Sequence, residues 1–64
     1  MKTHYDRDTD ALYLRFADGR VVESEEVAPG VVLDFDEEGR IVALEVLEAS
    51  RHLAAGAIGG IAAE

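Results

Sequence analysis

The chain has 64 residues, no cysteine, and 14 acidic against 6 basic side chains, for a net charge of −8. A single domain of this size buries only about 60% of its unfolded surface, and without cysteine neither disulfides nor a thiolate-held metal can add stability, so the monomer is marginal. The acidic balance repels a phosphate backbone, which excludes nucleic acid as an expected direct partner.

Period-two alternation of apolar residues predicts β-strands along most of the first fifty residues. Residues 3–5 form a short first strand. The strands at residues 11–16, 31–35 and 40–46 each direct apolar side chains to one face: Leu12, Leu14, Phe16, Val31, Leu33, Phe35, Val42, Leu44 and Val46. Residues 21–27 are strand-like but acidic in the middle, which suits an edge strand because charge discourages aggregation.

Short turns join these strands in the order expected of a meander. Asp18 and Gly19 are a strong signal for a tight hairpin, because both positions tolerate positive φ. Pro29 and Gly30 predict a type II turn, with Pro at its first central position and Gly at its second.

The third turn is constrained by register, because Leu33 must share a face with Val42 and Leu44. A loop of two residues (38–39) or of four (36–39) satisfies this requirement. We favour the four-residue loop, a type I turn closed by Gly39.

The opposite face of the sheet is also partly apolar, since the alternation places Tyr5, Tyr13, Val32, Ile41 and Leu47 on it or near it. A sheet with two apolar faces needs a second layer. Ser50 can cap a short helix through residue 55, whereas Gly56, Gly59 and Gly60 weaken any continuation.

We expect Leu53, with Ile58 and Ile61, to cover part of that opposite face, and a second copy of the chain to cover the rest. The candidate interface residues are Tyr13, Val32, Ile41, Leu47 and Leu53. The predicted fold class is therefore mainly β: a small antiparallel sheet, a β-meander of four or five strands, with a short C-terminal helix. Residues 1–52 form the single domain, and residues 53–64 are an Ala/Gly-rich tail that is partly helical or flexible.

The acidic turns also raise the question of a calcium site. Counted from Asp34, the spacing of Asp36, Glu38, Gly39 and Glu45 resembles an EF-hand loop, except for Glu at the fifth position. An EF-hand needs flanking helices, and the sequence on both sides alternates as strands, so we favour the hairpin. The metal-site candidates are Asp34, Asp36 and Glu38.

A second acidic turn carries Asp6, Asp8 and Asp10 at alternate positions, which could chelate a hard cation. Ala11 stands where an EF-hand requires Gly. We favour a turn in which the Asp side chains accept hydrogen bonds from nearby backbone N–H groups.

Groups for catalysis are few. The histidines, His4 and His52, lie at opposite ends of the chain; Ser50 is explained as a helix cap, and Ser24 would need a cleft that so small a sheet does not offer. We expect no enzymatic activity and no cofactor. Residues 1–6 do not resemble a secretion leader, and residues 53–63 are about half the length needed to cross a bilayer, so we expect a soluble cytoplasmic protein without a membrane partner.

Three blocks together resemble a known family: residues 5–14 (YDxxxDALYL), 31–42 (VVLDFDEEGRIV) and 44–50 (LEVLEAS). The family is domain of unknown function 2283 (DUF2283), and the similarity covers roughly residues 2–52. The resemblance implies a small, mainly β, soluble bacterial domain. Family members are often encoded beside small toxin-like proteins, which implies an antitoxin-like or accessory role.

Two functions from different classes follow. The first is an interaction module that forms a homodimer and binds a basic protein through its edge strand or acidic turns. The alternative is a divalent-cation module that uses the acidic turns.

Overall fold

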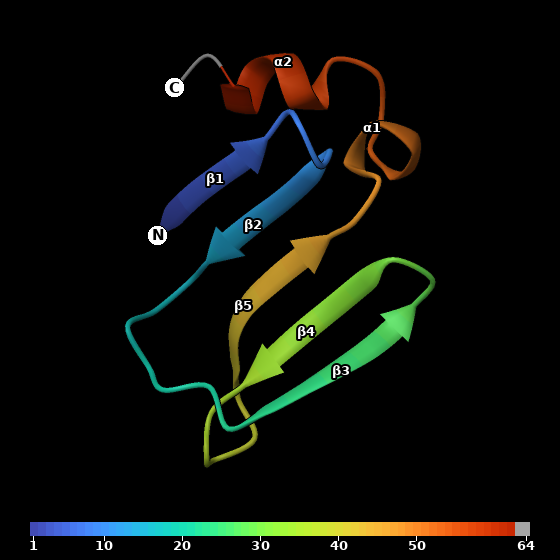
Figure 1. The fold of residues 1–64 in the computed structure, drawn as a ribbon. Coiled ribbons are helices and arrows are strands. Elements are labelled where there is room, and N and C mark those ends of the chain that lie inside the picture. The colour runs from blue at the N-terminus through green and yellow to red at the C-terminus, as the bar shows by residue number, and fades with distance from the viewer. Residues whose placement is uncertain (63–64) are drawn as a thin grey trace.

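The computed structural model describes residues 1–62. These residues form one antiparallel sheet of five strands followed by two short helices (Figure 1). The elements in chain order are β1 (Lys2–Asp6), β2 (Ala11–Arg15), β3 (Glu23–Ala28), β4 (Val31–Phe35), β5 (Ile41–Val46), α1 (Ala49–His52) and α2 (Ala57–Ala62). The predicted class, a mainly β protein with a small antiparallel sheet and C-terminal helix, is confirmed.

The strand order, β1-β2-β5-β4-β3, departs from a meander at one place. β2 pairs with β5 rather than with β3, so the predicted hairpin at Asp18 and Gly19 is wrong, and residues 16–22 form a loop instead. The physical reason is burial. β5 contains Val42 and Ala43, which are 2% and 0% exposed, and so occupies the centre of the sheet. The acidic β3 lies at the edge, as its charge predicted.

The other two predicted turns are present. β3 and β4 form a hairpin around Pro29 and Gly30, and Gly30 has the positive φ, 78°, that the type II prediction requires. A turn over residues 36–39 joins β4 to β5; the Gly39 N–H donates to the Asp36 carbonyl at 3.0 Å, and Gly39 also has φ 78°. Leu33 lies opposite Leu44, as the register argument demanded, with a register shift nearer the turn.

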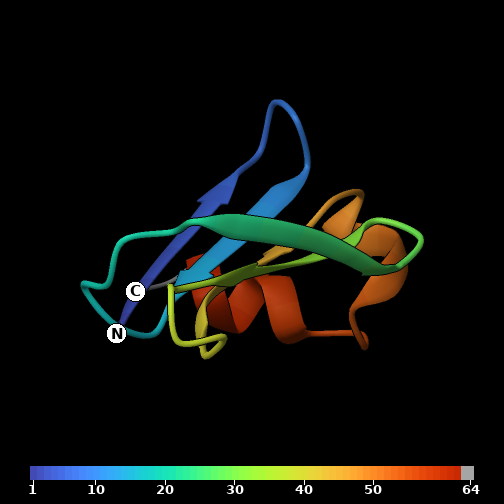
Figure 2. The ribbon, with the colours of Figure 1, turned by 90° about the horizontal axis from the view of Figure 1, so that it is seen from below.

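The core lies between one face of the sheet and the C-terminal helices; Figure 2 shows α2 along that face. Its buried residues are Leu12, Val46 and Ala49, and the partly buried residues packed against them are Tyr5, Leu44, Leu53, Ile58 and Ile61. Tyr5 pairs with Leu12 and therefore shares its face, not that of Tyr13. The prediction that the C-terminal segment covers the Tyr13 face is wrong as well: it covers the Leu12 face, where more apolar surface is available to bury. The Tyr13 face is left without a helical layer among the described residues.

The C-terminal segment differs from the single capped helix that was predicted. α1 is one turn long and begins after Glu48, whose φ is 50°, with no side-chain cap. α2 includes Gly59 and Gly60, which were expected to weaken a helix there. Ile58 and Ile61, three residues apart, bring one side of α2 onto the core and offset the low helix propensity of glycine. Ala63 and Glu64, in the predicted tail, lie outside the described residues.

No helix within residues 1–62 has the length and apolar character needed to cross a bilayer.

Candidate functional site

The face of the sheet that the helices leave uncovered, here called the open face, carries polar and apolar groups from the three central strands. Tyr13, Glu45 and Val32 lie in one row across β2, β5 and β4. Arg15, Ala43 and Asp34 form the next row. This alternation with the buried set on the other face follows from the period-two geometry of the strands.

Two carboxyl groups meet on the open face. Asp34 is only 5% exposed, and its Oδ1 accepts a hydrogen bond of 2.6 Å from the Ser24 hydroxyl of β3. Glu45 lies on the neighbouring strand, two residues beyond the partner of Asp34. Burial raises the pKa of Glu45, and the charge of Asp34, together with a hydrogen bond to it, raises that pKa further. The ionised form of Glu45 is therefore less favourable in the folded chain than it would be in water.

Neither strand shows this pairing by itself, because Asp34 and Glu45 lie on different strands. The comparison with an EF-hand loop included both residues, but as the first and last positions of a single loop. The register of β4 against β5, with Asp34 opposite Ala43, is what places them on adjacent strands of one face. A pair of carboxyls with a raised pKa occurs in acid–base enzymes. Here Asp34 is buried on the open face, and the neighbouring Ser24 hydroxyl donates to it.

The three metal candidates do not converge. Asp34 faces Ser24, and Glu38 is exposed. Asp36 stabilises its own turn, since its Oδ1 accepts hydrogen bonds of 2.9 Å from the backbone N–H groups of Glu38 and Arg40. Among residues 1–62, no group of three or more His, Cys, Asp or Glu side chains is arranged to hold a metal ion.

The other acidic turn is also structural, as predicted. Asp6 Oδ1 accepts from the backbone N–H of Asp8 at 2.9 Å. Asp10 is in the left-handed region, with φ 54°, and turns toward α1. The Asp6 bond satisfies a backbone donor within the turn, as predicted, whereas the Asp10 carboxylate is engaged by Tyr5 and Ser50.

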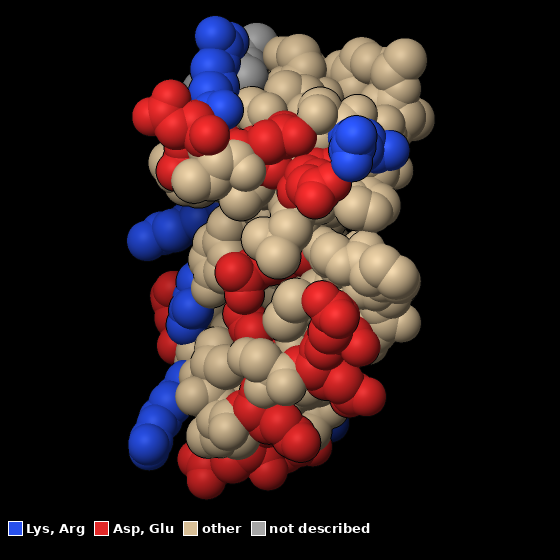
Figure 3. Space-filling model, turned by 45° about the vertical axis from the view of Figure 1, so that its right-hand side comes forward, with Lys and Arg blue, Asp and Glu red and all other residues tan. Residues whose placement is uncertain are grey.

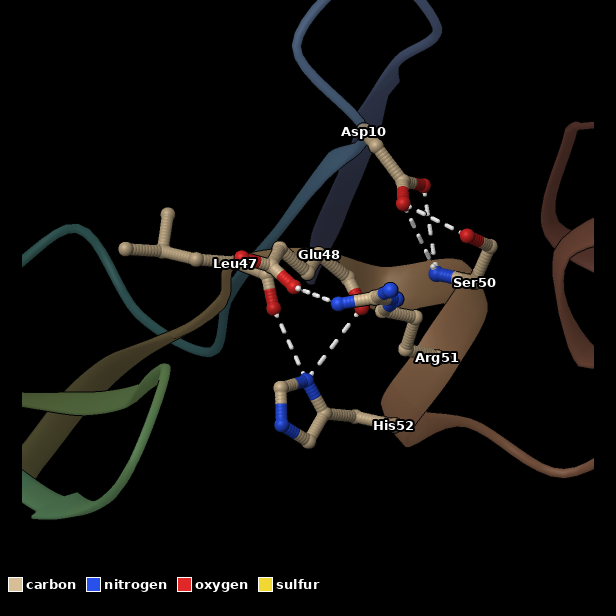
Figure 4. Close-up of polar contacts among 6 residues, drawn as sticks. All are labelled: Asp10, Leu47, Glu48, Ser50, Arg51 and His52. Atoms are coloured by element: carbon tan, nitrogen blue, oxygen red, sulfur yellow. Dashed lines mark hydrogen bonds and ion pairs between the residues drawn. The ribbon is translucent and has the colours of Figure 1, made fainter.

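Asp10 fastens the β1–β2 turn to α1 (Figure 4). Its carboxylate accepts from the Tyr5 hydroxyl at 2.6 Å, from the Ser50 hydroxyl at 2.6 Å and from the Ser50 N–H at 3.1 Å. The Asp10 carbonyl accepts from the Ala49 N–H at 2.8 Å. The hydrogen bonds from Ser50, and next that from Tyr5, lower the pKa of Asp10. The hydrogen bond between Tyr5 and Asp10 also raises the pKa of Tyr5. Ser50 is thus a donor to Asp10 rather than the predicted helix cap.

His52, at the other end of α1, lies beside the β3–β4 turn. Its Nδ1 lies 2.9 Å from the Leu47 carbonyl oxygen and 3.2 Å from that of Glu48 (Figure 4). Because carbonyls only accept, Nδ1 carries the proton. The ring lies close over Gly30, beside an open hollow of about 360 Å³ that Glu26, Pro29, Leu47 and Glu48 also line.

The structure separates the five predicted interface residues. Tyr13 and Val32 lie on the open face. Ile41, the first residue of β5, and Leu47, the residue after its last, are 48% and 44% exposed. Leu53 packs against the core on the helix-covered side, so the five do not form one continuous surface.

The most exposed element is β3, and every one of its six residues is exposed. It carries Glu23, Glu25 and Glu26. Among the charged side chains on the face that Figure 3 brings forward, acidic ones predominate, and most of the basic ones visible there lie along its left margin. Part of the net charge of −8 is therefore concentrated along the β3 edge, here called the acidic edge.

Comparison with family models gives a match to DUF2283, described as a protein of unknown function, over residues 2–50. The chain belongs to this DUF2283 family. The predicted resemblance is thereby confirmed. The DUF2283 match covers all five strands and includes both Asp10 and Ser50, whereas α2 lies beyond it. No curated protein and no solved structure matches the chain.

Proposed function

We propose that this DUF2283 domain is a non-enzymatic protein-interaction module of the cytoplasm, which self-associates and binds a basic protein in an antitoxin-like or accessory role. The observation that carries the proposal is the wholly exposed, acidic edge strand β3. A strand with three glutamates adds nothing to the core, and its charge attracts a basic partner while repelling acidic ones.

Self-association is supported by the open face. Tyr13 and Val32 are only partly buried there. A chain of 64 residues buries a smaller fraction of its surface on folding than a larger domain does, so burying this face in a dimer would add stability. Burying this face against a second copy would also remove Glu45 from water, whereas Asp34 is already buried. Since that favours a protonated Glu45, we expect the assembly to strengthen as the pH is lowered toward the ordinary carboxyl range.

Self-association is tested by the mass of the chain in solution. Tyr13→Asp should lower the assembled mass at a fixed protein concentration, because it places a charge on the open face. Thr9→Asp, which adds the same charge to an exposed turn, is the matched control and should leave the mass unchanged. A soluble, monodisperse Tyr13→Asp variant with the mass of the wild-type chain would refute the assigned surface.

Partner binding is tested with the tagged chain in cells of its source. A basic protein recovered at near-equal stoichiometry must then bind as a purified protein, with an affinity that falls as salt rises. Recovery of the chain alone, together with a monomeric mass, would refute the proposed function.

The alternative, a calcium module, finds no supporting geometry among the described residues, because Asp36 is engaged by its own turn. A calcium titration distinguishes the two functions. Heat of binding, or a rise in melting temperature with added calcium, would favour the cation module. The interaction module predicts neither.

A further inference from the structure

The two edges of the sheet differ in how they are used. β1 forms one edge, and α2 packs against it. β3 forms the other edge, and its principal packing partner is β4. An edge strand presents a row of backbone N–H and C=O groups that no neighbouring strand satisfies. The free edge of β3 is therefore a template on which another extended segment can pair.

The side chains of β3 define what that segment must be. Glu23 and Glu25 lie across from Phe35 and Leu33, on one face of the strand, and Glu26 lies on the other face. Carboxylates thus flank the backbone on both sides. A second β3 laid alongside would oppose glutamate to glutamate, which is unfavourable, whereas lysine or arginine at those positions is favourable.

Apolar side chains stand at both ends of this acidic stretch. Val22, just before β3, is 51% exposed, and Val27, near its end, is 50% exposed. The Val22 N–H donates to the Phe35 carbonyl at 2.9 Å, so this position is held against the sheet. The stretch from Val22 to Val27 holds six residues, and a partner strand rises by the same length per residue as β3, about 3.3 Å. A paired segment of about six residues would therefore span it.

We propose that β3 is a strand-addition site for an extended segment of a partner protein, with lysine or arginine in its middle and apolar residues at its ends. This inference rests on the proposed function and names the partner's recognised chemistry. The glutamates that keep a second copy off the edge are the groups that admit a basic strand.

The test uses the full-length, isotope-labelled chain and a blocked peptide of about eight residues, with lysines alternating with threonines between two terminal valines. Binding should perturb the backbone amides of β3 and slow their hydrogen exchange. A second peptide of the same sequence carries N-methyl groups on alternate backbone nitrogens. It keeps the charge but cannot complete the ladder, so it should bind at least about tenfold more weakly.

Charge reversal gives the matched variants. Glu23→Lys with Glu25→Lys should weaken binding of the unmethylated peptide by about tenfold or more. Glu37→Lys with Glu38→Lys makes the same change of charge in the exposed β4–β5 turn and should alter binding by less than about threefold. If both double variants lose the same amount of peptide affinity, or if both peptides bind the wild-type chain equally well, the contact is general charge attraction. Either result would overturn strand addition.

Two further outcomes separate this inference from the proposed function. If a purified native partner binds the wild-type chain and the Glu23/Glu25 variant equally, the interaction module stands and the β3 assignment is overturned. If the Glu23/Glu25 reversal lowers the assembled mass of the chain itself, a second copy uses β3 in the wild-type protein, and the assignment is likewise overturned.

Discussion

Replacement of Gly30 by Ala tests how the β3–β4 turn is joined to α1. Gly30 has φ 78°, and a Cβ added there would lie 2.9 Å from His52 Cε1 and 3.2 Å from the Leu47 carbonyl oxygen. Gly39 offers a matched control, since it has the same φ of 78° but no atom within 4 Å of the added Cβ. The two substitutions share the backbone strain and differ in the contact.

The magnitudes follow from that difference. A residue with a Cβ in the left-handed region costs about 1–2 kcal/mol, and this is the whole expected effect of Gly39→Ala. Gly30→Ala adds crowding that displaces His52 and presses on a backbone carbonyl, which costs about a further 1–2 kcal/mol. For a domain of this size, each kcal/mol lowers the melting temperature by about 4–8 °C.

The assay is thermal and urea unfolding of both variants at one protein concentration, because self-association would otherwise shift the midpoint. In the double variant Gly30→Ala with His52→Ala, only the crowding with Leu47 is retained, although the bonds from Nδ1 are lost. Its unfolding free energy should therefore be non-additive relative to the two single variants. Equal destabilisation by Gly30→Ala and Gly39→Ala would refute the argument that His52 and Leu47 restrict the turn.

Three further predictions concern titration and the core. Glu45, whose pKa burial and Asp34 raise above the ordinary 4.5, binds its proton more tightly in the folded chain. The free energy of unfolding should therefore fall as pH rises from about 4.5 through the folded pKa, and Glu45→Gln should flatten that fall in urea titrations; an unchanged slope would contradict it. Asp10 has the opposite sign: the bonds from Ser50 lower its pKa below 3.8, so its stabilisation is present above that value and is lost as pH falls through the folded pKa. Asp10→Asn should melt at a lower temperature than wild type at neutral pH and converge with it in acid; a constant difference at all pH values would count against this. Leu12 is 3% exposed, and Leu12→Ala should cost about 2–5 kcal/mol out of about 3–10 for the whole fold, leaving a largely unfolded chain by far-ultraviolet circular dichroism, whereas a sharp, wild-type-like melt would contradict the core assignment.

Local features of this protein were predictable because each depends on residues close together in the chain. The β3–β4 hairpin needs only Pro29 and Gly30, and the β4–β5 turn needs the Asp36 carboxylate and the positive φ of Gly39. The edge position of β3 also follows from its composition, since three glutamates in six residues cannot lie at the centre of a sheet.

The site was less predictable, because its contacts join distant segments. Asp10 and Ser50 are 40 residues apart, and Ser50 alone looks like an ordinary helix cap. The Asp34–Glu45 pair depends on the β4–β5 register. Tyr5 was assigned to the wrong face because a short strand of five residues carries too little alternation to set its phase; its pairing with Leu12 sets it instead.

By itself, then, the sequence determined the strands, two of the three predicted turns, the acidic edge and the DUF2283 family. Tertiary structure decided that β5 pairs with β2, that the helices cover the Leu12 face, and that Asp34 meets Glu45. The reason is energetic. Turns and alternation are set by backbone sterics within a few residues, whereas strand order and the covered face depend on which arrangement buries the most apolar surface across the whole chain.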